Sequence, residues 1–247
     1  MALNSIYSRA EQFLIHFACR TTTRKELTPV QKDTLQNLLS ESNSDLFQRF
    51  EDKLPQGILF QAVREFEVGA LTVTGPTFNM THDSVSIIKP LKIGTYNLVS
   101  NNDVTAYLSN YMRTFNQEMA TILNNIATSI NGLKYKRAGK IFEIALPHIA
   151  PNEKRNLLQE LVNYNLDDVG EVNFSFTRYT NFEERLYNIK TQIMYQQLEI
   201  GNPFHLNVRV DINNRNFIES MEPTLIQQIW LNADSTIEAH FNSFLNL

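Results

Sequence analysis

The sequence is poor in the residues that many cofactor and metal sites need. It contains 8 glycines and 1 cysteine in 247 residues. Few glycines leave few backbone positions that can approach a phosphate closely, which argues against a nucleotide-dependent enzyme. An AT-rich genome would produce the same scarcity. The single cysteine, Cys19, cannot form an internal disulfide, so the sequence favours a reducing compartment and a cytoplasmic protein.

Long apolar runs are also missing. No stretch approaches the roughly 18 apolar residues that a membrane span needs. Arg9 and Glu11 interrupt the first apolar stretch, which argues against a signal peptide. The formal net charge of -4 at pH 7 gives no overall attraction to nucleic acid or to an anionic membrane. We therefore expect no membrane contact, and nucleic acid is a disfavoured partner.

The short motifs of common enzymes are absent as well. The 5 histidines form no zinc-binding pair, and one cysteine cannot build a zinc ribbon. There is no nucleophile elbow, phosphate loop or dinucleotide fingerprint. A triad assembled from distant residues leaves no such motif, so an enzyme stays open. The sequence nevertheless favours a non-catalytic protein without metal or cofactor, and it identifies no catalytic residue.

One long helix is the clearest positive feature. Between Asp103 and Asn131, apolar residues recur at spacings of three and four, which predicts a continuous stripe along a helix. Gly132 follows at the position where a left-handed residue closes a helix. The stripe predicts that Phe115 and Ile122 lie in the core.

The remaining pattern predicts an α+β protein. Residues 1–55 read as an N-terminal helical segment, with helices over 5–20, from the capping box at Thr28 onward, and over 44–54. Residues 56–247 read as an α+β domain, a mostly antiparallel sheet built from two meanders, each followed by a long helix. A short helix is predicted over 152–164. The segment 182–200 fits either a strand or a helix.

A row of polar side chains is the first candidate site. Polar residues alternate with apolar ones over 204–213, so they project from one face of the predicted strand. A solvent-exposed face explains this row. If the protein instead holds a polar ligand between the sheet and the long helix, we expect the ligand-binding residues to be Arg178, His205, Arg209 and Asp211.

A basic cluster is the second candidate. It comprises Lys134, Lys136, Arg137 and Lys140. These cations could bind phosphates if they share an exposed face. No stacking aromatic platform accompanies them, and the protein is acidic overall, so a solvated strand is the preferred interpretation.

The two ends of the chain are the third candidate, a partner interface. The residues expected there are Ile6, Phe13, Leu14, Phe17 and Phe244. The first four form one face of a predicted helix that is too short to be stable alone in water, so it packs on this domain or on another chain. The resulting hypothesis is a bacterial or viral accessory or assembly protein that contacts another protein or a second copy of itself. The alternatives are a small-ligand binder or enzyme with a polar pocket, and a nucleic-acid binder through the basic cluster.

The second half also resembles a scattered bacterial family of hypothetical proteins. The resemblance rests on Leu206–Ile212, on Ala239–Phe244, and on Tyr135–Gly139 after the long helix. The family has no assigned activity, so the resemblance implies no substrate, cofactor or site residue.

Overall fold

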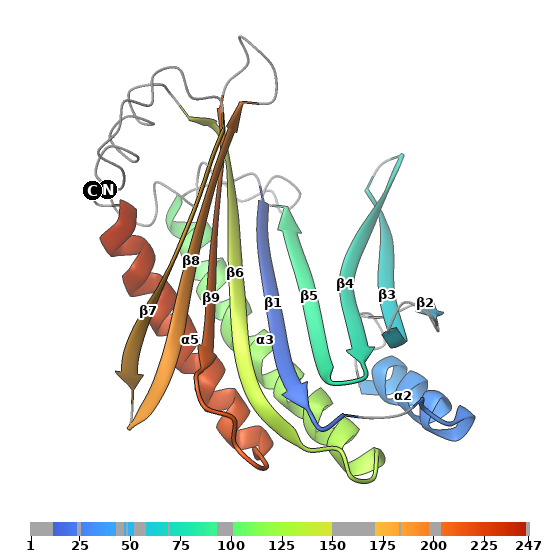
Figure 1. Cartoon of the computed structure of the whole chain (residues 1–247). Helices are drawn as coiled ribbons and strands as arrows, with labels where there is room; N and C mark the ends of the chain where they lie inside the picture. Colours follow the sequence, from blue (N-terminus) through green and yellow to red (C-terminus); the bar gives the residue numbers. More distant parts are fainter. Residues whose placement is uncertain are drawn as a thin grey trace.

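The computed structural model describes residues 12–23, 26–42, 47, 49–51, 58–68, 70–92, 101–149, 171–182, 184–197 and 204–245. Over these residues the chain forms one nine-stranded antiparallel sheet and three helices (Figure 1). The predicted α+β class, with a mostly antiparallel sheet, is therefore confirmed. The elements are β1 (Gln12–Thr21), α2 (Pro29–Ser42), β2 (Arg49–Glu51), β3 (Ile58–Val68), β4 (Leu71–Thr81), β5 (Ser84–Lys92), α3 (Asn101–Ser129), β6 (Tyr135–Ile149), β7 (Glu171–Phe182), β8 (Arg185–Gln197), β9 (Phe204–Asn214) and α5 (Pro223–Leu245).

The sheet has two halves that meet at its centre. The strand order is β2-β3-β4-β5-β1-β6-β9-β8-β7. The pair β1–β6 lies at the centre. On the β1 side the next strands outward are β5, β4 and β3, and on the β6 side they are β9, β8 and β7. A helix follows each series along the chain, α3 after β5 and α5 after β9. In each half, a helix thus follows three consecutive strands, whereas β2 and α2 of the first half have no counterpart among the described elements of the second.

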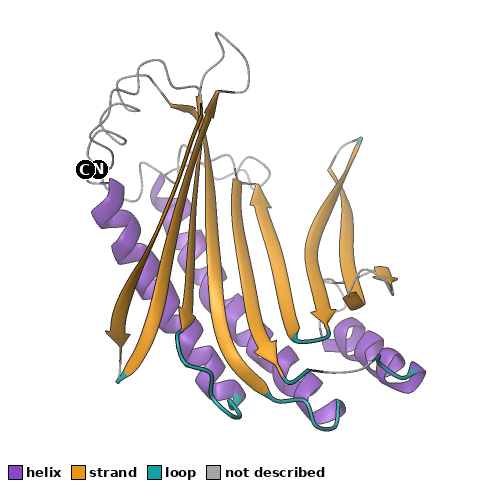
Figure 2. Cartoon of the chain, in the orientation of Figure 1, coloured by secondary structure: helices purple, strands orange, loops and turns teal. Residues whose placement is uncertain are grey.

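The helices all lie on one face of the sheet (Figure 2). Strand side chains alternate between the two faces, and the burial of β9 follows this rule, with Val208, Val210 and Ile212 buried beneath the helices. No helix of the described residues covers the opposite face, which we call the open face. Polar or small side chains occupy most of its positions on β1, β6 and β9.

The core fills the space between the sheet and the helices. Phe17 of β1 packs edge-on against Phe115 of α3 and Trp230 of α5, with ring centroids 5.0 and 4.8 Å apart. Phe115 and Ile122 are 1% and 2% exposed, so the prediction that they lie in the core is confirmed. Gly132 has a φ of 80° at the end of α3, as expected for a residue that closes a helix.

The start of α2 also agrees with the sequence. Thr28 and Gln31 form the predicted capping box, since the Thr28 backbone N–H donates to Gln31 Oε1 at 2.9 Å and the Gln31 N–H donates to Thr28 Oγ1 at 3.3 Å. These two bonds satisfy donors that no helical carbonyl can reach.

The helix predicted over 5–20 is wrong where the structure describes it. Residues 12–21 form β1, which pairs with both β5 and β6. Alternation places Ile15, Phe17 and Cys19 in the core, with exposures of 0%, 2% and 2%. Phe13, Leu14 and Phe17 also fit helical spacing, but pairing along both edges of β1 satisfies its backbone and decides the conformation. The predicted N-terminal segment 1–55 therefore contributes β1 to the same sheet as the strands of 56–247.

Two other predicted segments have different outcomes. The helix predicted over 44–54 is wrong at Arg49–Glu51, which form β2 and pair with β3. The open question over 182–200 is resolved in favour of a strand, because Arg185–Gln197 form β8 between β7 and β9. The helix predicted over 152–164 lies outside the described residues.

We predict that Phe115→Ala and Ile122→Ala each lower the free energy of unfolding by about 2–5 kcal/mol, because each substitution leaves a cavity in the core. Urea denaturation measures the change. Gln117→Ala, at an exposed position of the same helix, is the matched control and should change stability by less than about 0.5 kcal/mol. Equal stability of all three variants would show that α3 does not anchor the core.

Candidate functional site

A recess of about 290 Å³ opens on the open face over the central strands, near the C-terminal ends of β1 and β9. Its floor is made by small side chains, because Ala18 of β1 lies opposite Gly139 of β6. Gly139 in turn lies opposite Asn213 of β9. A Cβ on Gly139 would stand 2.7 Å from Asn213 Cβ and 3.0 Å from Ile212 O, so only glycine fits this strand contact.

The polar wall of the recess is organised around Asn213. Its side-chain oxygen accepts hydrogen bonds from Arg137 Nη2 and from Asn188 Nδ2, the latter at 3.2 Å. Its side-chain nitrogen donates to Asp211 Oδ1 at 2.8 Å. Arg137 Nε also donates to the backbone oxygen of Asn214 at 2.9 Å. The Asn213 amide therefore connects a guanidinium group to a carboxylate.

Two arginine–aromatic contacts lie beside this wall. The guanidinium carbon of Arg137 is 5.6 Å from the centroid of the Phe217 ring, and that of Arg215 is 4.3 Å from the Tyr179 ring. Both distances are within the range of a cation–π interaction. Phe217 and Tyr179 remain 63% and 59% exposed, so the contacts leave most of each ring open to a partner.

Further along the open face, Arg209 pairs with Glu143 at 3.3 Å. His16 of β1 lies nearby, in the cross-strand row that also contains Ile141 and Asp211. Burial and, to a smaller extent, the charge of Arg209 lower the pKa of His16 to about 4, while Asp211 opposes the shift. His16 Nε2 has no hydrogen-bond partner among the described residues. His16 is therefore neutral at pH 7.

The structure brings together only part of the predicted ligand-binding row. Arg209 and Asp211 share the open face with the recess, and Asp211 lines it. Arg178 of β7 lies opposite Ile189 of β8, whose side chain is buried beneath the helices. Alternation thus places Arg178 on the other face from Arg209 and Asp211. His205 lies on β9 two positions before Asn207, and its side chain is outside the described residues.

The recess is not the pocket that the sequence suggested between sheet and long helix. The space bounded there by Phe17, Leu123 and Trp230 has no room for a water molecule. The polar side chains of β9 point away from it, to the open face.

The basic cluster does not form one surface. Lys134 is exposed, Lys136 is half-buried where the β1–β6 register shifts, and Arg137 binds Asn213 on the open face. Lys140 is 0% exposed and points toward the helices. Its place in a solvated strand or a phosphate-binding patch is therefore a wrong prediction.

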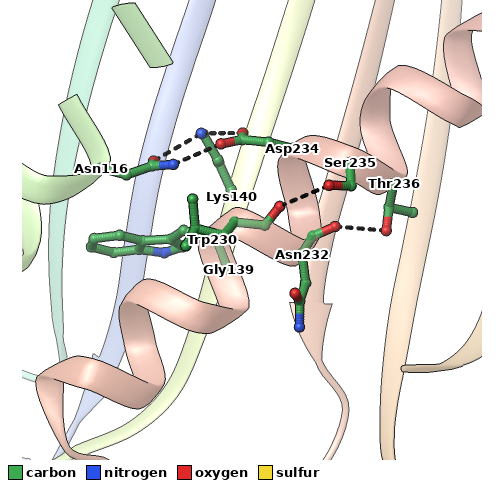
Figure 3. Close-up of polar contacts among 9 residues, drawn as sticks. Asn116, Gly139, Lys140, Trp230, Asn232, Asp234, Ser235 and Thr236 are labelled. Atoms are coloured by element: carbon green, nitrogen blue, oxygen red, sulfur yellow. Dashed lines mark hydrogen bonds and ion pairs between the residues drawn. The ribbon is translucent and has the colours of Figure 1, made fainter. Parts of the chain in front are cut away.

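Lys140 belongs to a closed polar network inside the core (Figure 3). Its ammonium group donates to Asn116 Oδ1 at 3.0 Å and to Asp234 Oδ1. Asn116 Nδ2 donates to Asp234 Oδ2 at 2.6 Å. The ammonium also lies 4.8 Å from the centroid of the Phe17 ring. Burial lowers the pKa of Lys140, and the charge and hydrogen bond of Asp234 oppose this shift.

This network connects three elements rather than forming a reaction centre. Lys140 comes from β6, Asn116 from α3 and Asp234 from α5. Trp230 of α5 donates its indole N–H to the Gly139 backbone oxygen at 3.1 Å and covers the network from one side (Figure 3). Because Lys140 and Asn116 are each 0% exposed, a substrate has no path to them. We assign the network a structural role.

The residues of the predicted partner interface do not form one described surface. Phe17 lies in the core, and Leu14 is half-buried on β1. Phe13 is in β1 and Phe244 in α5, but their side chains lie outside the described residues, as does Ile6.

Sequence reasoning missed Asn116, Asp234 and the recess floor. One signal was present: Lys140 alternates in phase with Phe142 and Ile144, which places it on the buried face. No sequence signal placed Asn116 beside Asp234, because they are 118 positions apart. Ala18 and Gly139 become neighbours only through the β1–β6 register.

Comparison of the chain with protein-family models, curated proteins and solved structures finds no match. The resemblance to a family of hypothetical proteins stays a prediction. No group of three or more His, Cys, Asp and Glu side chains in the described ranges is placed to hold a metal ion. None of the described helices is both long enough and apolar enough to span a membrane.

We predict that Lys140→Met lowers the free energy of unfolding by about 3–5 kcal/mol, because it leaves Asp234 and Asn116 without their cation. Adding Asp234→Leu should recover part of that loss, since an apolar pair needs no compensating charge. Urea denaturation measures both variants. Lys134→Met, an exposed lysine before the same strand, should stay within about 0.5 kcal/mol of the parent. If Lys140→Met matched Lys134→Met, the network would not stabilise the fold.

We predict a histidine-dependent loss of stability in acid. The pKa of His16 is about 4 in the folded protein, against 6.5 for an ordinary histidine. Between these values the unfolded chain binds a proton that folded His16 does not, so stability falls as the pH decreases from 6.5 to 4. His16→Gln should reduce this dependence in urea denaturation at several pH values. Parallel pH profiles for parent and variant would contradict the assignment.

Proposed function

We propose that the protein is a non-catalytic binding protein that acts through protein–protein contacts, in which an extended segment of the partner pairs with β7. The observation that carries the proposal is the long edge of the sheet at β7, which no strand or helix of the described residues covers. The partner is a second copy of the chain or another protein with an extended segment.

The strand β7 has the properties of a pairing edge. It is 12 residues long, and no second strand of the described residues pairs with it beyond β8. An unpaired edge presents a row of free backbone N–H and C=O groups. Native proteins usually protect such an edge with proline, lysine or a short strand. β7 contains neither proline nor lysine, whereas β2 at the opposite edge has only 3 residues.

Side chains beside this edge suit a protein partner. Tyr179 is 59% and Phe182 is 38% exposed on β7, and Arg215 stacks over Tyr179. Tyrosine and arginine are enriched among the residues that contribute most to protein–protein affinity. Val172, Phe174 and Phe176 pack against the core, so the edge strand is held in place from the helix side.

The alternatives have less support. A nucleic-acid surface would require a continuous set of exposed cations, yet Lys140 is buried and Arg137 binds Asn213. Carboxylates of Asp211 and Glu143 lie on the same open face and would repel phosphates. A catalytic centre would require accessible acid–base groups, whereas Lys140 and Asn116 are fully buried and the Asp234 side chain is only 17% exposed.

A second copy of the chain is the first partner to test. Antiparallel pairing of β7 with β7 of another copy has two-fold symmetry, the commonest symmetry of protein dimers. Each copy would provide the same 12-residue edge, so the two sheets would join into one.

We predict that the protein forms dimers in light scattering after size-exclusion chromatography, and that Ser175→Lys with Thr177→Lys abolishes them. Both positions are exposed on β7, and lysines near a two-fold axis repel each other across a paired edge. Gln36→Lys with Asn37→Lys, exposed on α2, is the control with the same added charge and should dimerise like the parent.

A labelled peptide with the sequence of residues 171–182 tests directly whether the β7 edge accepts an extended segment, even if two full chains do not dimerise. Fluorescence anisotropy should show saturable binding of this peptide to the parent protein and to the α2 control, but not to the β7 lysine variant. A protein that stays monomeric and also fails to bind the peptide would contradict the proposed function.

A further inference from the structure

The recess on the open face carries a second, independent inference, because its charges are arranged in an unusual way. Arg20 of β1 lies directly opposite Arg137 of β6, and both line the recess. Like charges directly opposite each other on neighbouring strands destabilise a sheet. A pair of this kind therefore needs counter-charge close to both guanidinium groups, and only one of the two has a carboxylate as its hydrogen-bond partner.

Arg20 is the arginine whose charge is compensated. Its Nη1 donates to Asp83 Oδ2 at 2.5 Å, and about half of each side chain is exposed. Arg137 has neutral partners, the side-chain oxygen of Asn213 and the backbone oxygen of Asn214. No carboxylate of the described residues forms an ion pair with Arg137. The guanidinium end of the recess thus lacks one negative charge.

The other end of the recess has the opposite charge. Asp211 lines it and accepts a hydrogen bond from Asn213 Nδ2 at 2.8 Å. Since Asn213 also binds Arg137, the guanidinium and the carboxylate lie at the two ends of one amide group. A ligand spanning a single amino acid's length can therefore meet both charges.

The dimensions and floor of the recess restrict the ligand further. A volume of about 290 Å³ is at the lower limit for small-molecule sites. Ala18 and Gly139 provide the floor between the charged ends. A polyanion would be repelled by Asp211, and a simple cation by the two arginines.

We propose that this recess binds a small zwitterion of amino-acid size, with its carboxylate between Arg20 and Arg137 and its ammonium group on Asp211. Guanidinium groups bind carboxylates with two parallel hydrogen bonds, and Asp211 retains acceptor positions beyond the one that Asn213 uses. The ligand supplies the negative charge that the arginine pair lacks, and it adds a hydrogen-bond donor for Asp211.

An NMR titration of the full chain with glycine, β-alanine and 4-aminobutyrate tests the proposal, because these zwitterions differ only in charge separation. At least one should bind saturably, about tenfold more tightly than acetate or ethylammonium, each of which meets only one end of the recess. Arg20→Gln and Asp211→Asn should each weaken binding about tenfold. Arg49→Gln removes an exposed, ion-paired arginine on β2 and should leave binding unchanged.

Ala18→Leu provides a second variant that alters no charge. Its larger side chain fills the recess floor, so binding should be lost while the melting temperature stays near that of the parent. If Ala18→Leu proved unfolded, the Arg20→Gln result would decide, since Arg20 is half-exposed. The proposal is overturned if no zwitterion binds saturably, if acetate binds as tightly as the best zwitterion, or if the folded recess variants bind like the parent.

Discussion

The pairing of β1 with β6 is the contact on which the rest of the structure depends. It joins the two halves of the sheet in one continuous register from Gln12 opposite Ala145 to Arg20 opposite Arg137. All strands of the first half lie beyond β1, and all strands of the second half lie beyond β6. Each half has a helix-covered face and an open face. The β1–β6 register aligns these faces, so it determines which side chains of both halves reach the core and which reach the recess.

The Lys140 network sits directly on this junction. Lys140 lies opposite Phe17 in the β1–β6 pair and reaches Asn116 of the first half and Asp234 of the second. Buried ion pairs contribute little net stability compared with apolar packing. Their geometry is more demanding than that of apolar packing, because a shift in register would leave a charge without a partner. We therefore interpret the network as a device that selects one alignment of the two halves.

The sequence is most informative where local rules decide the structure. The periodic stripe around Phe115 and the capping box at Thr28 both depend on neighbours within one or two helical turns. Local rules give the wrong structure for β1, because Phe13, Leu14 and Phe17 fit helical spacing. The pairing that makes this segment a strand is with β6, more than 100 positions away. The candidate site shares this limit. Asp211 and Arg137 are recognisable as polar strand residues, but their meeting through Asn213 follows only from the register of β6 with β9.

The central place of β1 has a consequence for synthesis of the chain. Ribosomes add about 5–20 residues per second, so on the order of 10 s separates the appearance of β1 from that of β6. During this interval β1 can pair with β5 along one edge. Its other edge has no partner yet, and the side chains of Ile15 and Phe17 lack contacts that residues not yet translated will provide. A nascent chain in this condition exposes both an unpaired strand and apolar surface, the two features that promote aggregation and chaperone binding. The centre of the sheet is therefore completed only once β6 has been translated, after the strands of the first half.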